Sequence, residues 1–218
     1  MNMDWNSLDL KTYREIYGII TNAFTPEEDK QFKIAALLGG ITYDELLEQP
    51  LTATTEMVAN TVFLYEKPKP VKIKKEYTLN GRVYVPFKDF LEVTTSQYID
   101  YQAVIVENFE EHLIDLMTII LIPKGHTYGD GYDREQQVSD IETLSVAEAL
   151  GIADFFITKY RRSLKRTLLY SKAEMWLTMK KAPKEVKEIL KSQQKEMNQK
   201  IDELLIMCGS LSLKQLLK

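Results

Sequence analysis

The chain has 218 residues, of which 44% are hydrophobic and 28% are charged, with a formal net charge of −4. This length allows one large domain or two small ones with a buried core, and the composition is ordinary for a globular protein. The single cysteine excludes an intramolecular disulfide bond and fits a reducing compartment. Because no apolar run approaches the roughly 20 residues that span a bilayer, and the first residues do not resemble a signal peptide, we expect synthesis in the cytosol and no membrane contact.

The net charge conceals an uneven distribution along the chain. Residues 1–158 contain 13 Lys and Arg against 26 Asp and Glu, whereas residues 159–200 contain 13 against 4. An acidic body with a basic C-terminal limb can bind an anionic partner or other copies of itself. Charge compensation within one fold explains the pattern equally well.

Helical spacing of apolar residues dominates the N-terminal third. Thr25, Pro26 and Glu28 are typical of the N-cap, first turn and capping box of a helix, which Gly39 and Gly40 should end. The helices expected in this third cover residues 9–24, 26–38, 43–49 (with Thr42 as N-cap) and 52–65.

The sequence Lys-Pro-Lys-Pro at residues 67–70 indicates a break between elements. After it, the spacing of apolar residues changes from helical to strand-like. Two short runs with strand-like alternation flank Asn80-Gly81, which is the strongest short signal for a hairpin turn. We therefore predict a β-hairpin over about 73–87. A lone hairpin is marginal in water, so it must pack on helices or pair with another chain.

The centre of the chain returns to a helical pattern. A helix that starts near Gln97 and bends near Asn108 is expected to reach Ile122, and its stretch 116–122 is apolar on almost every face, as in a buried core. Two capping signatures predict the next helices: Asp133 with Gln136, and Ser145 with Glu148. The second of these helices should reach Trp176, with Gly151 as a point where it could divide.

A last amphipathic helix is predicted from Pro183 to about Met207. Its apolar stripe covers fewer than four regular heptads, so it predicts either a partner-helix face or packing within the chain's own domain. The residues of this stripe are Val186, Leu190, Met197, Ile201 and Leu204.

These elements together predict a mainly α fold, a multi-helix protein with one small β-hairpin. We expect an N-terminal helical domain at 1–66, a hairpin with a helical core at 71–180, and a C-terminal amphipathic helix and tail at 181–218.

Polar residues in and near the glycine-rich loop, 123–133, do not form a recognisable metal or phosphate site. Asp130, Asp133 and Glu135 lack the ligand spacing of a calcium loop, so we expect the glycines to supply positive φ angles and Asp133 to cap a helix.

The two histidines, His112 and His126, lack the further ligands of a zinc site and an oriented nucleophile. An enzyme would require a pocket around one of them. Cys208 is expected to be a small buried hydrophobic residue. We predict no catalytic residue, cofactor or metal.

Five basic residues within eight positions form the one candidate contact for DNA or another anionic partner: Lys159, Arg161, Arg162, Lys165 and Arg166. On a helix, Arg162, Lys165 and Arg166 share a face. Phosphate contact there would depend on salt and not on base sequence. The alternatives are a solvated surface and ion pairs with the acidic residues Glu107, Glu110, Glu111 and Asp115.

The order of several short motifs carries a resemblance to a known group of proteins. The motifs are 34–47 (IAALLGGITYDELL), the hairpin around Asn80-Gly81, 94–101 (TTSQYIDY), 122–125 (IPKG), 131–133 (GYD), 153–156 (ADFF) and 168–170 (LLY). This order resembles small proteins encoded in the structural gene modules of tailed phages of Bacteroides-type hosts, including the crAss-like viruses. The resemblance covers about residues 25–176.

The resemblance implies a non-enzymatic virion-associated protein, made in the host cytoplasm. Such a protein would be a structural or packaged cargo protein, ejected with the genome in one version, that contacts portal, tail or capsid components or copies of itself. The alternatives are a tail assembly chaperone that is not retained in the particle, and an electrostatic nucleic-acid-binding protein.

Overall fold

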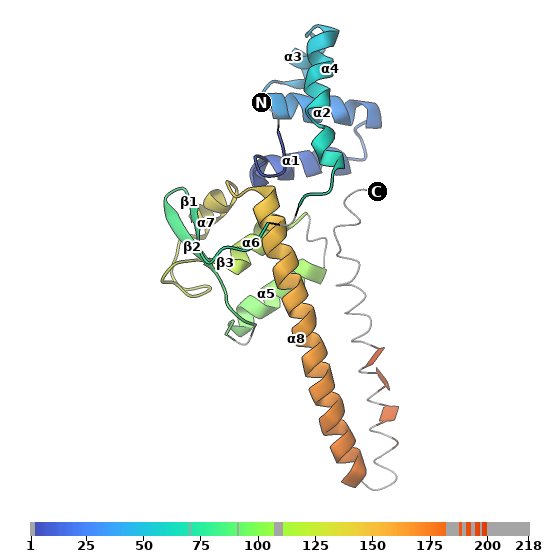
Figure 1. Ribbon diagram of the computed structural model, residues 1–218, viewed down its shortest axis with the longest axis vertical. Helices are drawn as coiled ribbons and strands as arrows, with labels where there is room; N and C mark the ends of the chain where they lie inside the picture. The colour runs from blue at the N-terminus through green and yellow to red at the C-terminus, as the bar shows by residue number, and fades with distance from the viewer. Residues whose placement is uncertain are drawn as a thin grey trace. The chain divides into compact units, whose positions relative to one another are not determined.

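A computed structural model describes residues 3–69, 71–90, 92–106, 111–181 and the positions 188, 191, 192, 195, 196, 198 and 199. It confirms a mainly α fold with a small antiparallel sheet (Figure 1). Two compact units divide the chain, a first unit of Met1–Ala153 and a second unit that begins at Asp154. The predicted division into 1–66, 71–180 and 181–218 stays a prediction.

The first unit begins with a group of helices. They are α1 (Leu10–Thr21), α2 (Glu27–Gly39), α3 (Tyr43–Leu47), α4 (Leu51–Ala59) and the 3₁₀-helix η1 (Val62–Tyr65). The prediction of one helix over 52–65 is wrong, because the α-helix ends at Ala59 and a separate 3₁₀-helix follows from Val62. Helix α2 contacts α1, α3 and α4, and its small residues Ala35 and Ala36 pack with Leu46 of α3 in a local core.

The ends of these helices follow their local sequence with one exception. Gly40 ends α2 with a φ of 68°, and Thr42 and Glu45 form the predicted capping box of α3. The predicted N-cap role of Thr25 is wrong, because Pro26 occupies that position and no side chain caps the helix. Thr25 is instead buried.

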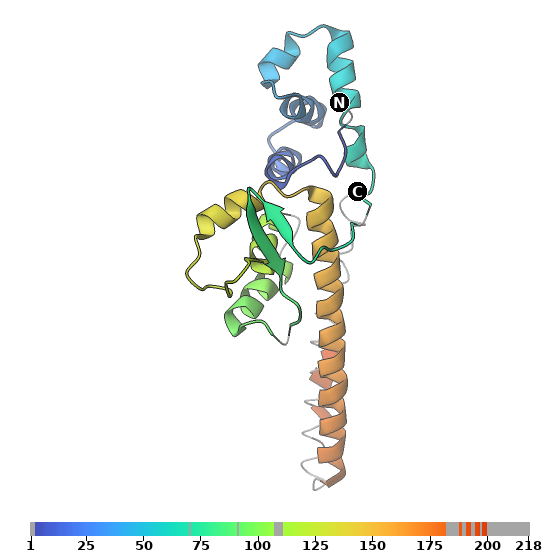
Figure 2. The same cartoon turned by 60° about the vertical axis from the view of Figure 1, so that its left-hand side comes forward.

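The predicted hairpin is present and is part of a larger sheet. Strands β1 (Tyr77–Leu79) and β2 (Arg82–Pro86) pair in antiparallel register, with Tyr77 opposite Tyr84 (Figure 2). Positive φ angles of 46° at Asn80 and 79° at Gly81 make the tight turn. A third strand, β3 (Leu121–Pro123), pairs with the other edge of β2, so the expectation of a single hairpin is incomplete.

The expected central helix is two helices, α5 (Thr95–Val106) and α6 (Leu113–Ile120). The predicted break at Asn108 lies outside the described residues. The prediction that the helix reaches Ile122 is wrong, because the chain leaves α6 at Leu121 and pairs with β2. Every residue of α6 except Asp115 is buried, in agreement with the predicted core.

Buried polar side chains compensate for the abrupt end of α6. The last carbonyl groups of a helix have no partner within the helix, and leaving them buried and unpaired costs free energy. The Gln97 amide donates to Ile119 O (2.7 Å), and the Gln137 amide donates to both Thr118 O (2.9 Å) and Leu121 O (2.8 Å).

The two helices with predicted capping pairs are α7 (Arg134–Ile141) and α8 (Val146–Lys181). The Asp133 carboxylate accepts from Gln136 N, and the Ser145 hydroxyl accepts from Glu148 N. Helix α8 continues through Gly151, so the expected division there is absent. A Cβ atom at this position would lie 2.4 Å from Val71 O. Only glycine therefore fits here, because the backbone at residue 71 passes so close to the helix.

Candidate functional site

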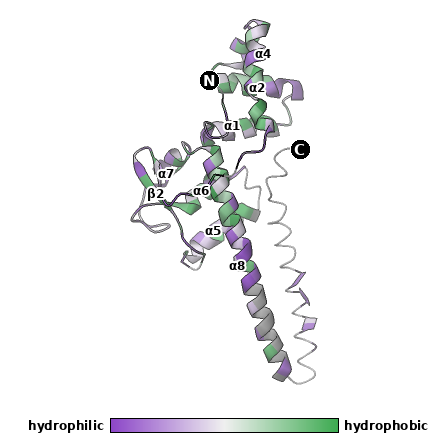
Figure 3. Cartoon of the chain, viewed as in Figure 1, coloured by the Kyte–Doolittle hydropathy of each residue, from purple (hydrophilic) through white to green (hydrophobic). Residues whose placement is uncertain are grey.

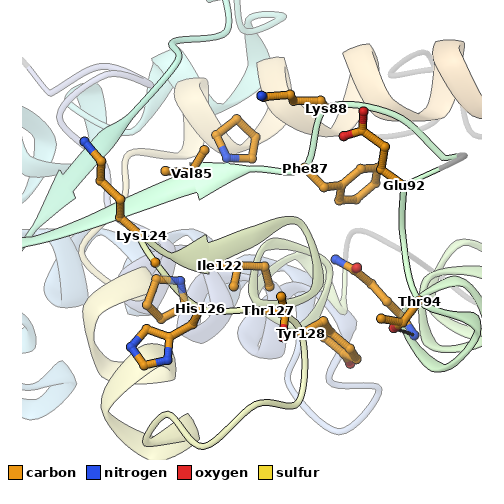
Figure 4. Close-up of a pocket in the computed structure, with 14 residues that line it drawn as sticks. Val85, Phe87, Lys88, Glu92, Thr94, Ile122, Lys124, His126, Thr127 and Tyr128 are labelled. Carbon is orange, nitrogen blue, oxygen red and sulfur yellow. Dashed lines mark hydrogen bonds between the residues drawn. The ribbon is translucent and has the colours of Figure 1, made fainter.

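A pocket of about 310 Å³ lies beside the end of the sheet in the first unit (Figure 4). Its lining comes from the end of β2 and the segment that follows it, from the first turns of α5, and from β3 with the start of the glycine-rich loop. Figure 4 shows Val85 and Phe87 on one side of the space and His126, Thr127 and Tyr128 on the other. The volume is at the small end of the range for ligand sites, which is roughly 300–1,000 Å³.

The pocket floor is the face of the sheet that does not carry the buried Tyr84. Side chains alternate between the two faces of a strand, and the directly opposed residues Val85 and Ile122 share one face. Tyr84 points to the other face, where it is buried against α7. The pocket therefore begins with an apolar surface from two paired strands.

The segment after β2 is held by a cluster of aromatic rings. Phe87 lies edge-on to Phe90, with ring centroids 5.1 Å apart, and Phe90 lies 5.1 Å from Tyr101 of α5. Tyr101 is buried. These contacts fix the segment that carries Lys88, on the rim of the pocket.

Hydrogen bonds and glycine conformations hold the opposite wall. Gly125, Gly129 and Gly131 have φ angles of 91°, 79° and 62°, as predicted for a loop that needs the left-handed region. The Tyr128 hydroxyl donates to the Asp100 carboxylate at 2.6 Å. Burial and this bond both raise the pKa of Tyr128, so the hydroxyl stays protonated and keeps donating at neutral pH.

The remaining polar groups of the glycine-rich loop also have partners within the protein. Lys124 pairs with Glu76 at 2.7 Å, although both side chains are exposed and such pairs contribute little. Nδ1 of His126 lies 3.3 Å from Asp130 O, and its ring contacts Tyr132 edge-on. The pocket thus offers a ligand mainly apolar surface.

A second polar cluster fixes β1 and β2 against α7. The carboxylate of Asp140, which is fully buried, accepts hydrogen bonds from Asn80 (3.1 Å), Arg82 (3.2 Å), Tyr84 (2.7 Å) and Gln136 (2.9 Å). Burial alone would raise the pKa of Asp140, but these bonds together lower it below its ordinary value. Asp140 is therefore ionised at neutral pH and positions the sheet.

His126 is the one histidine among the residues that line the pocket. Its surroundings show whether it is placed to act as a general base. A histidine acting as a general base must reach the proton of a nucleophile or of a bound water. In the part of the chain that the structure describes, no hydrogen bond joins His126 to a Ser, Thr or Cys side chain. Its Nδ1 faces a backbone carbonyl.

The other candidates for catalysis or metal binding are not brought together. His112 lies 3.2 Å from Asp115 at the surface, and Asp130 contacts Thr127 and His126 within its own loop. Among the residues that the structure describes, no group of three His, Cys, Asp or Glu side chains could hold a metal ion. Cys208 lies outside the described residues.

The predicted anionic-partner residues all lie on α8 in the second unit. Arg162, Lys165 and Arg166 are exposed, whereas Lys159 and Arg161 are half-buried. The predicted partner-helix face lies outside the described residues: Val186, Leu190, Met197, Ile201 and Leu204.

Three buried polar residues that support the sheet and the pocket were not predicted from the sequence: Gln97, Gln137 and Asp140. Gln97 lies four residues before Tyr101, Gln137 four before Ile141 and Asp140 four before Leu144, so each is spaced in sequence as if on the same helix face as a buried apolar residue. A polar residue on an apolar helix face indicates a buried, hydrogen-bonded side chain. That signal could have identified these three residues, but not their partners.

Comparison with protein-family models, with curated proteins and with solved structures finds no match. In the described residues no helix is long and apolar enough to cross a membrane.

Proposed function

We propose that this chain is a non-enzymatic protein of a tailed-phage structural gene module that acts through contacts with other proteins. The resemblance of its motif order supplies the phage context. The observation that carries the contact role is the number of exposed large hydrophobic side chains on the N-terminal helices and on the turn at Phe24 between α1 and α2.

Seven of the eleven exposed large hydrophobic side chains in the described chain lie between residues 20 and 65: Ile20, Phe24, Phe32, Leu47, Leu51, Val62 and Tyr65. Phe24 is 97% exposed and Leu51 is 81% exposed. Single exposed apolar residues are common on any protein, so what supports the proposal is that seven large ones lie within one stretch of sequence; a contiguous patch of such residues marks a binding surface. Fully burying one such side chain contributes about 1.5–3 kcal/mol.

Two hypotheses are consistent with this contact role, and they differ in whether the finished particle contains the protein. In the first, the chain stays in the particle as a structural or cargo protein. In the second, it is an assembly chaperone whose apolar helices cover a tail component during assembly and then leave. Exposed apolar surface suits both forms, so the composition of the finished particle distinguishes them.

Complementation of a phage that lacks the gene tests the contact role. The host supplies the wild-type chain or the double variant Phe24→Ser with Leu51→Ser. We expect the wild type to restore particle yield and the variant to restore little, because each replaced contact should weaken partner binding about tenfold or more. The melting temperature should hardly change, since both side chains are exposed.

A matched control replaces Ile99 and Leu177 by Ser, two exposed hydrophobic residues outside the N-terminal helices. This control should restore particle yield. Full restoration by the Phe24 and Leu51 variant, or equal failure of both folded double variants, would contradict the assignment of the contact surface to the N-terminal helices.

A further inference from the structure

The exposed side of α8 carries cations and aromatic rings on the same face. Side chains three or four residues apart on a helix are neighbours, and such spacing links Phe155, Lys159, Arg162, Arg166 and Tyr170. Lys165 lies beside this row. We refer to these six residues as the cationic face. Figure 3 shows a hydrophilic (purple) segment of α8 beside its label.

The opposite side of the same helix is apolar and buried. Phe156, Ile157 and Tyr160 are each at most 5% exposed. On the cationic face, by contrast, Phe155 is 42% exposed and Tyr170 is 66% exposed. Lys159 lies over one side of the Phe155 ring and the Tyr170 hydroxyl is hydrogen-bonded to Glu174, so a partner would contact the remaining exposed surface of each ring.

Three of the four cations on this face have no acidic partner among the described residues, and the next acidic residue after them along the helix is Glu174, which bonds Tyr170. From residue 155 to 173 the chain has six Lys and Arg and no Asp or Glu. Among the described residues, Arg162, Lys165 and Arg166 make no ion pair. Their guanidinium and ammonium groups are thus free to bind an anionic partner.

The two aromatic rings favour one class of anion. Lys159 Nζ lies 5.6 Å from the ring centroid of Phe155, so the ring and a cation are already adjacent. Proteins that bind single-stranded nucleic acid combine cations that follow the backbone with aromatic rings on which bases stack. Duplex DNA and acidic proteins offer the negative charge, but duplex bases are already stacked.

We propose that the cationic face of α8 binds single-stranded nucleic acid without sequence preference. Arg162, Lys165 and Arg166 contact phosphates, and Phe155 and Tyr170 stack on bases. The distance along the helix from Phe155 to Tyr170 is about 22 Å, which suits a segment of about four nucleotides. This inference does not depend on the proposed particle role, because it concerns a different surface.

Fluorescence anisotropy with a labelled oligothymidine and the full chain tests it across a range of salt concentrations. We expect binding that weakens with salt, since each neutralised phosphate of a single strand adds about 0.7 to the log–log slope. The triple variant Arg162→Ala, Lys165→Ala and Arg166→Ala should reduce this slope by about 2. Alanine favours helices, so α8 should remain intact, which circular dichroism checks.

The aromatic residues have a separate signature. Phe155→Ala with Tyr170→Ala should weaken oligothymidine binding at least about fivefold, without changing the salt slope. Because duplex DNA cannot use the rings in the same way, its binding should be weaker and unaffected by this double variant.

A matched control removes three exposed lysines from the first unit: Lys67→Ala, Lys69→Ala and Lys75→Ala. It changes net charge equally but should leave the slope unchanged. Absence of oligothymidine binding at low salt, or an equal effect of both triple variants, overturns the proposal. Salt-sensitive self-association that only the α8 variant abolishes, with no oligothymidine binding, would instead identify an acidic surface of a second copy as the partner.

Discussion

Asp140 is the residue on which the sheet most depends. A buried carboxylate is costly unless it is hydrogen-bonded, and Asp140 accepts from four side chains, which lie on the β1–β2 turn, on β2 and on α7. Burial also raises the pKa of Tyr84, and its bond to Asp140 adds to this effect. Tyr84 therefore remains a donor at neutral pH.

Replacing Asp140 by Asn should destabilise the first unit. The amide keeps one acceptor but presents an NH₂ group to donors, so we expect a loss of about 1–3 kcal/mol in the free energy of unfolding at pH 7. Since the folded-state pKa of Asp140 is lowered, its stabilisation is present above the unfolded value of about 4 and is lost as pH falls through the folded value. The variant should therefore lose less stability than the wild type below pH 4.

Urea unfolding at pH 7 and in the acid range measures both effects. Glu48→Gln is the matched control, because this carboxylate is exposed, and it should resemble the wild type. An Asp140→Asn variant as stable as the wild type at pH 7 would contradict the role of Asp140 as the anchor of the sheet.

Helix α8 contains a glycine that is explained by contact with a segment about 80 residues earlier in the sequence. Glycine normally weakens a helix interior by about 1 kcal/mol relative to alanine, yet Gly151 lies inside a continuous 36-residue helix. The close approach of Val71 O leaves no room for a side chain there. The Lys74–Glu148 ion pair joins the same segment to the start of α8.

Two alanine substitutions should therefore have opposite effects. Gly18→Ala in α1 places its Cβ in open space and should stabilise by up to about 1 kcal/mol. Gly151→Ala places its Cβ 2.4 Å from a backbone carbonyl and should destabilise by about 1–3 kcal/mol. Thermal unfolding followed by circular dichroism compares them, and a gain at both positions would contradict the packing described at Gly151.

Across the whole molecule, local sequence signals predicted most helices and the hairpin. Strand β3 and the candidate site depend on contacts between residues far apart in the sequence, which local signals do not predict. The caps at Thr42 and Asp133 and the turn at Asn80-Gly81 involve neighbours within a few residues, so the sequence alone was sufficient. Strand β3 was not predicted because its three residues continue an apolar helical pattern. Their partners in β2 lie 35 to 39 positions earlier in the sequence (Pro86 with Leu121, Tyr84 with Pro123), which makes the pairing non-local.

The candidate site was less predictable than the fold for the same reason. The pocket combines residues from 85 to 128, and Asp140 meets Asn80 across 60 positions of sequence. The glycine-rich loop was recognised and its positive φ angles were predicted. The bond between Tyr128 and Asp100 that holds it had no local signal.

We propose that the chain acts through protein contacts in the assembly of a phage particle. Quantitative peptide mass spectrometry on gradient-purified particles and on the matching infected-cell lysate tests this proposal. A virion protein should be present in particles at a fixed stoichiometry, comparable to that of structural components. For the chaperone form, we expect abundance in the lysate during assembly and absence from particles. Absence from both, in a phage that encodes and needs the gene, would contradict the proposal.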